Sequence, residues 1–162
     1  MKVWTYPPPD ETFRDAVRQE FGALARECGV KLVEVETMIF GFCTPYAVLT
    51  IGAYPGHFRG ICVKFRRRER DEAVCVNDGV DIGLANIEEL VTGRCSAVHT
   101  ARRRWASDEI WNEVAGLASV TRQVAMSFLI TPNGDWTGLR AHVDEKIRNA
   151  PKPWRGLYEE MG

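Results

Sequence analysis

The chain has 162 residues, a length that fits one domain with a sizeable core. Hydrophobic residues make up 45% of it and charged residues 27%, which is the balance of a globular domain and not of a disordered segment. A formal net charge of −1 argues against general attraction to nucleic acid or anionic lipid. The sequence contains no apolar stretch long enough to span a membrane, and its N-terminus lacks the apolar stretch of a signal peptide, so a cytoplasmic location is expected.

The first predicted element is a helix over residues 10–28. Residues 1–9 form a proline-rich lead-in, expected to be extended. Asp10 can then cap the helix and Gly29 can end it. The apolar positions that follow Asp10 recur at spacings of three and four and share one helix face: Phe13, Val17, Phe21, Leu24 and Cys28.

Residues 30–84 change to a period near two, which predicts strands. The expected strands cover 30–36, 46–51, 57–66, 73–76 and 80–84, and the charged residues 67–72 form a hairpin tip between the third and fourth. Short, turn-rich connections favour antiparallel pairing. We therefore expect a sheet of four or five mainly antiparallel strands.

The C-terminal part returns to a helical period. A short helix is expected over 87–91, a surface loop over 94–106, a long helix over 107–130 and a last helix from Asp135 or Thr137 to about residue 149. Pro151 and Pro153 end that helix, and 151–162 form a short tail. The whole chain, 1–162, is predicted to be a single α+β domain whose sheet is packed by the N-terminal helix and two C-terminal helices.

The cysteines and histidines provide no recognisable metal or catalytic pattern. Five cysteines, an odd number without a CxxC pair, are best interpreted as free thiols, with Cys28, Cys62 and Cys75 reduced and buried in apolar patterns. Cys95 and His99 supply one possible pair of zinc ligands, which Cys62, Cys75, His57 or His142 could complete, but nothing in the sequence fixes their proximity. No Gly-x-Ser-x-Gly elbow is present. We expect no catalytic residue, no cofactor and no metal.

The strongest charge feature is a pair of arginine runs. Between positions 57 and 104 there are ten Lys or Arg against seven Asp or Glu, although the whole chain is slightly acidic. A positive patch of this kind can bind an acidic or phosphorylated partner. The alternative is a solvated hairpin tip whose charges prevent edge-to-edge pairing. The candidate partner-binding residues are these arginines and two tryptophans that could serve as anchors or pack in the core: Arg66, Arg67, Arg68, Arg70, Arg102, Arg103, Arg104, Trp105 and Trp111.

The order of features resembles that of small bacterial immunity proteins, which block a cognate toxin. The resemblance is one of layout over residues 10–149. It is carried by the helix ending at Cys28-Gly29-Val30, the meander from Tyr46 to Leu84, the short helix at 87–91 and the Gly134-Asp135-Trp136 turn. It implies a non-enzymatic module that binds another protein, with a toxin as the expected partner. A small enzyme or ligand-binding domain, with its site between the sheet and the C-terminal helices, is one alternative. A nucleic-acid accessory protein that uses the arginine runs is the other.

Overall fold

The α+β class is confirmed by a computed structural model, which describes residues 8–53, 61–75, 77, 80–94 and 107–150. A five-stranded sheet of β1 (Val33–Glu36), β2 (Ile39–Cys43), β3 (Ala47–Ala53), β4 (Ile61–Arg67) and β5 (Ile82–Gly83) follows α1 (Pro8–Glu27). The chain continues with α2 (Leu84–Thr92), α3 (Ser107–Val124), α4 (Met126–Ile130) and α5 (Trp136–Asn149). Every neighbouring pair of strands is antiparallel, and the strand order is the chain order, β1-β2-β3-β4-β5.

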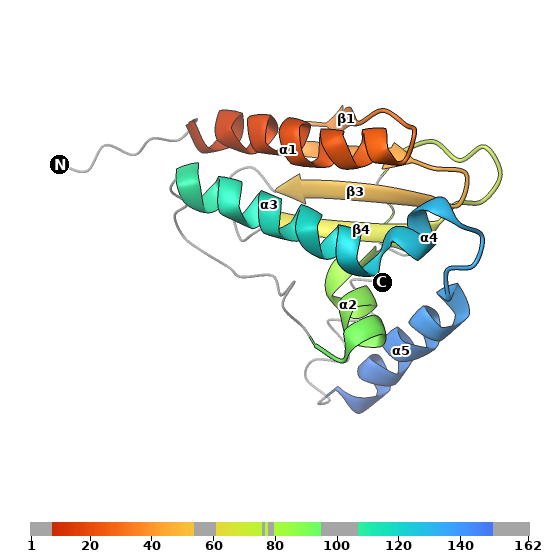
Figure 1. Ribbon diagram of the computed structural model, residues 1–162. Coiled ribbons are helices and arrows are strands. Elements are labelled where there is room, and N and C mark those ends of the chain that lie inside the picture. The colour runs from red at the N-terminus through yellow and green to blue at the C-terminus, as the bar shows by residue number, and fades with distance from the viewer. Residues whose placement is uncertain (1–7, 54–60, 76, 78–79, 95–106, 151–162) are drawn as a thin grey trace.

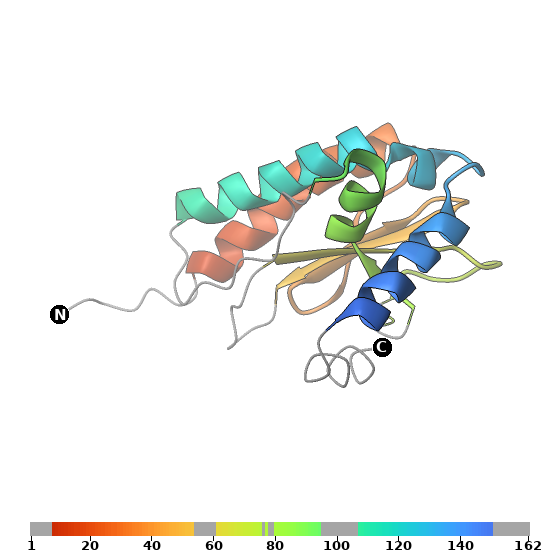
Figure 2. The ribbon, with the colours of Figure 1, turned by 90° about the horizontal axis from the view of Figure 1, so that it is seen from below.

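One face of the sheet is covered by helices. α1 and α3 lie side by side across it, with α2 and α4 beside them and α5 packed on α2 (Figures 1 and 2). The strands present large apolar side chains to this layer, including Phe40, Leu49, Ile51 and Phe65, and all of them belong to one buried cluster with Phe13 and Phe21 of α1. The alternation of side chains along β3 and β4 places these residues on a single face, which gives the core its location.

The opposite face is crossed by the segment that follows β4, residues 68–75. Gly41 shows where this segment lies. A Cβ placed on Gly41 would stand 2.6 Å from Val74 Cγ1 and 2.6 Å from the carbonyl oxygen of Leu49. Only a residue without a side chain lets strand and segment approach so closely.

Three expectations about the sheet were wrong. Residues 73–75 form no strand, because the carbonyl groups of Ala73 and Cys75 accept hydrogen bonds from the Arg66 side chain instead of a neighbouring strand. The fifth strand is limited to Ile82–Gly83, since α2 already begins at Leu84. β2 was not anticipated at all, because Gly41 interrupts its run of strand-forming residues.

The helix boundaries also differ in two places. α1 begins at Pro8, inside the expected extended lead-in, since proline is tolerated in the first turn, where the backbone N–H has no helical partner. The long helix ends at Val124, and Ala125, with φ −111° and ψ −2°, separates it from α4. This break redirects the chain so that Phe128 and Leu129 enter the core. None of the helices in the described ranges has the combination of length and hydropathy needed to cross a bilayer.

Candidate functional site

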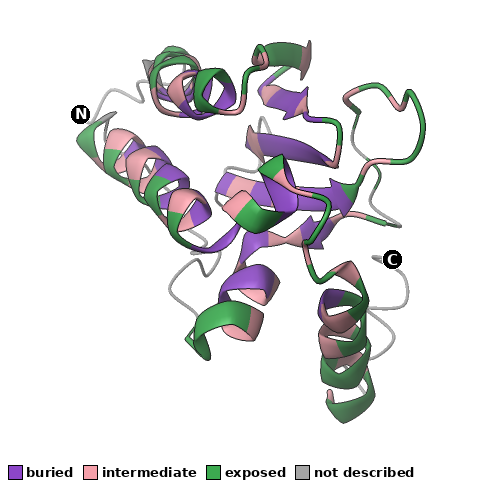
Figure 3. Cartoon of the chain, turned by 45° about the vertical axis from the view of Figure 1, so that its right-hand side comes forward, coloured by how far each residue is buried: buried purple, intermediate pink, exposed green. Residues whose placement is uncertain are grey.

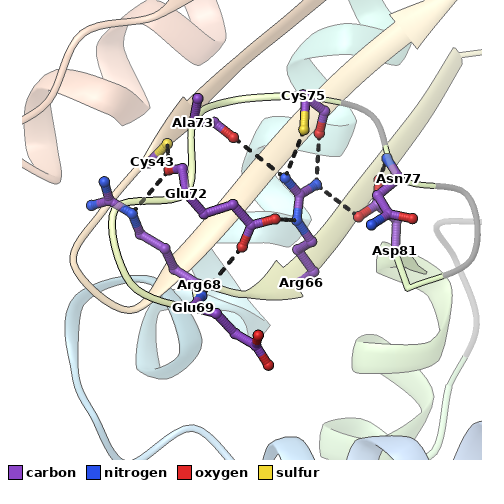
Figure 4. Close-up of polar contacts among 9 residues, drawn as sticks. All are labelled: Cys43, Arg66, Arg68, Glu69, Glu72, Ala73, Cys75, Asn77 and Asp81. Carbon is purple, nitrogen blue, oxygen red and sulfur yellow. Dashed lines mark hydrogen bonds and ion pairs between the residues drawn. The ribbon is translucent and has the colours of Figure 1, made fainter.

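Arg66 was predicted to lie on an exposed patch, and the structure buries it. Its side chain is only 2% exposed, at the end of β4 on the sheet face crossed by residues 68–75. The guanidinium donates from Nε to Glu72, from Nη1 to Asp81 (2.9 Å) and to the Cys75 carbonyl (2.6 Å), and from Nη2 to the Ala73 carbonyl (3.4 Å) (Figure 4). Arg66 therefore anchors the segment to the sheet and is not available to a partner.

The charges around Arg66 are matched. Burial by itself lowers the pKa of the Arg66 guanidinium, but the hydrogen bonds and charges of Asp81 and Glu72 raise it overall, so the cation is maintained. Burial raises the pKa of Glu72, and the hydrogen bonds from the Glu69 N–H and from Arg66 outweigh it and lower that pKa below its usual value. Asp81 also accepts from the Asn77 N–H at 2.8 Å. This network is a structural one that ties residues 72–75, Asn77 and Asp81 to the end of β4.

The other arginines of the first run divide into two kinds. Arg68 is half-buried and donates from Nε to the Glu72 carbonyl (3.2 Å) and from Nη1 to the Thr44 carbonyl (3.1 Å), so it also holds the segment in place. Arg67 and Arg70 are exposed. The exposed acids Glu69 and Asp71 alternate with them, so the accessible charges of this turn sum to zero.

The second run and the tryptophans are not brought to this turn. Arg102, Arg103, Arg104 and Trp105 lie outside the described residues. Trp111 is half-buried on α3, where it packs against the hydrophobic core. The surroundings of Trp111 therefore agree with the alternative that it packs in the core. Its role as an anchor for a partner stays a prediction.

The thiols are free but not equally shielded. Cys28, Cys43 and Cys62 are partly buried, and burial is the main cause that raises the pKa of each thiol. Cys75 is exposed, which contradicts its predicted burial. The reason is the missing fourth strand: residue 75 pairs with no strand, and the Arg66 guanidinium donates both to its carbonyl oxygen (2.6 Å) and to its Sγ (3.3 Å).

His142, a third candidate for chemistry, serves a helix contact. Its Nε2 lies 3.2 Å from Glu89 of α2, and Lys146 donates to the same carboxylate at 2.7 Å, so these side chains join α5 to α2. His57, His99 and Cys95 are outside the described residues. Within the ranges that the structure describes, no three His, Cys, Asp or Glu side chains are grouped so that they could hold a metal ion.

A groove between α1 and the start of the sheet is the feature that sequence reasoning missed. It has a volume of about 440 Å³. Its apolar part consists of Gly22 on the helix and Val30, Leu32 and Phe40 opposite. Its charged part consists of Arg18, Arg26, Lys31 and Glu34. We call this surface the basic groove. It includes Glu34 of β1, the strand at one edge of the sheet. β1 is mostly exposed (Figure 3).

The charges of the basic groove do not cancel. Glu34 pairs with Arg14 (3.3 Å) and with Arg18 (3.7 Å), and the Arg18 guanidinium also lies 5.6 Å from the centroid of the Phe40 ring. Arg26 and Lys31 are exposed and form no ion pair with any residue in the described ranges. The groove therefore presents two uncompensated positive charges next to an apolar surface. The turn at Arg67 and Arg70 presents no such excess of positive charge.

A signal for one wall of the groove was present in the sequence. Arg18, Gly22 and Arg26 recur at a spacing of four and form one line along α1. The facing wall is formed by residues 30–34. Its position depends on how the helix packs on the sheet, and no spacing of residues in the sequence predicts it. Comparison of the chain with family models, with curated proteins and with solved structures gave no match.

Proposed function

We propose that this protein is a non-enzymatic module that binds another protein, and that the partner places an acidic segment in the basic groove. The observation that carries the proposal is the pair Arg26 and Lys31, two exposed cations beside an apolar hollow. Within the described ranges neither forms an ion pair, and Glu34, the acid that lines the groove, is paired with Arg14 and Arg18. Such a surface attracts carboxylates and accelerates encounter with an acidic partner.

Recognition should proceed through side chains and not through added strand pairing. β1 is an edge strand of four residues, and its pairing with β2 is irregular between Glu34 and Glu36. Acidic side chains, short length and a bulge are the features by which native edges avoid pairing with another chain. The groove beside this edge contains one acidic side chain of β1, Glu34, which is already paired with Arg14 and Arg18.

The resemblance in layout to immunity proteins adds a first class of partner to examine, a toxin. The positive charge of the groove is opposite to the acidic surface common in inhibitors of nucleases, so a toxin that presents its own acidic surface is the better candidate. The identity of the neighbouring gene would supply the protein to purify for the binding test.

The test compares two charge-matched variants. Arg26→Gln with Lys31→Gln removes two charges from the groove, and Arg67→Gln with Arg70→Gln removes two from the exposed turn. If each lost pair contributes about 0.5–1 kcal/mol, the groove variant should bind the purified partner about 5- to 30-fold more weakly at low salt. The turn variant should bind like the wild type.

Circular dichroism and the melting temperature would confirm that both variants fold. Equal affinity of the groove variant and the wild type would contradict the proposal. If only the turn variant binds the partner more weakly, the arginine run, and not the groove, is the binding surface.

A further inference from the structure

Gly22 is an unusual residue for its position. It lies inside α1, where glycine is less favourable than alanine because it has more backbone freedom to lose. A Cβ on Gly22 would meet only Arg26 Nη1, at 3.6 Å, which is an ordinary van der Waals contact. The helix and its neighbours therefore do not require a glycine here.

Because Gly22 has no side chain, it leaves space in the basic groove on the α1 side. The Arg26 side chain, one turn further along α1, extends back over it. Opposite lie the half-buried side chains of Val30 and Leu32 and the ring of Phe40. The volume of about 440 Å³ lies in the range that binding pockets occupy, roughly 300–1,000 Å³.

We infer that the basic groove receives one apolar side chain of the partner, seated over Gly22 against Leu32, with flanking carboxylates bound by Arg26 and Lys31. This inference rests on the proposed function and specifies its ligand: an acidic segment with an apolar residue between its acids. Each half of the groove has its counterpart in such a segment. The cations match the carboxylates, and the apolar wall matches the central side chain.

Other anions fit the groove less well. Inorganic phosphate would leave the apolar wall without a contact. A nucleic acid needs an accessible aromatic surface for its bases, and Phe40 is only 2% exposed.

The inference can be tested with synthetic peptides and fluorescence anisotropy. The probe is a short labelled peptide with Phe between Glu and Asp residues. The comparison peptides replace Phe with Ala, or the acids with Lys. We expect the acidic Phe peptide to bind, the Ala peptide to bind at least about fivefold more weakly, and the Lys peptide not to bind.

Gly22→Leu should fill the groove and reduce binding of the Phe peptide at least about tenfold. Gly116→Leu is the control for placing leucine at a helical glycine away from the groove, since Gly116 of α3 has no atom near its Cβ position. Gly116 is exposed whereas Gly22 is buried, so the thermal melts are needed to separate loss of stability from loss of binding. Gly22→Ala is a milder variant, expected to fold at least as stably as the wild type. Thermal melts would show whether each variant is folded.

Equal binding of the Phe and Ala peptides, or unchanged binding by Gly22→Leu, would overturn the inference. So would equally effective competition by inorganic phosphate or by a single-stranded oligonucleotide. The proposed function fails separately: if Arg26→Gln with Lys31→Gln weakens partner binding and Gly22→Leu does not, charge recognition stands and the apolar anchor does not. If neither variant weakens binding, both proposals fail.

Discussion

Replacing Arg66 by methionine should destabilise the fold strongly. The substitution keeps most of the side-chain volume but removes the cation that neutralises Asp81, whose side chain is 2% exposed, and Glu72, whose side chain is 26% exposed. Removing one partner of a buried ion pair costs about 3–5 kcal/mol, because the remaining charge is left uncompensated. We expect a value near the lower end, about 3 kcal/mol at pH 7, since Glu72 can turn toward water.

The cost should also depend on pH. The pKa of Glu72 is lowered in the folded protein, so its contribution to stability is present above the unfolded value of about 4.3 and is lost as the pH falls through the lower folded value. Without Arg66 the part of that contribution that comes from Arg66 disappears, while the hydrogen bond from the Glu69 N–H remains. The difference in stability between Arg66→Met and the wild type should therefore shrink from pH 7 to below pH 4.

Urea denaturation at several pH values measures both effects. Arg67→Met, at the exposed neighbouring position, is the control, and we expect it to change the free energy of unfolding by no more than about 0.5 kcal/mol. A cost for Arg66→Met below about 1 kcal/mol at pH 7, or a cost that does not vary with pH, would refute the role assigned to the buried network.

Three further outcomes are expected. Gly41→Ala should lower the free energy of unfolding by about 1–3 kcal/mol, measured in urea, because the new methyl group would overlap both β3 and the segment of residues 68–75. Cys75 should react with a thiol reagent before Cys62 does, as followed by mass spectrometry of the folded protein, and simultaneous labelling would contradict their different exposure. Glu89→Gln should lower the melting temperature at pH 7 but much less below pH 4. In the wild type, hydrogen bonds and positive neighbours outweigh burial and lower the pKa of Glu89, so its ion pairs are lost only in acid.

The helices and the core could be predicted from the sequence, because the spacing of apolar residues directly reflects which side chains are buried. Phe13, Val17 and Phe21 are spaced by four, and all three are fully buried. In β4, the alternation of Ile61, Val63 and Phe65 likewise identified the core face of the strand. These patterns arise from the apolar layer itself, so they can be recognised without knowing the rest of the fold.

Which charged side chains are exposed could not be predicted from the sequence in the same way. Alternation places Arg66 on the face opposite Phe65, but it does not say whether that face is covered. The cover is formed by residues 68–75, a stretch without a regular spacing of apolar residues that is held in place by the bonds of Arg66 to Glu72, Ala73 and Cys75. The basic groove was missed for a related reason, since Arg26 and Lys31 meet only after α1 has packed across the sheet.

The strand order bears on how the chain reaches its fold. Because each strand pairs with the next one along the sequence, the sheet forms by closing short loops, which costs little chain entropy. The contact between α1 and α3 is different: Glu27 and Arg122, which pair at 3.0 Å, are separated by 95 positions. We therefore expect the hairpins of β2, β3 and β4 to assemble first and the two long helices to join across them late, with higher φ-values in these strands than at the Glu27–Arg122 contact.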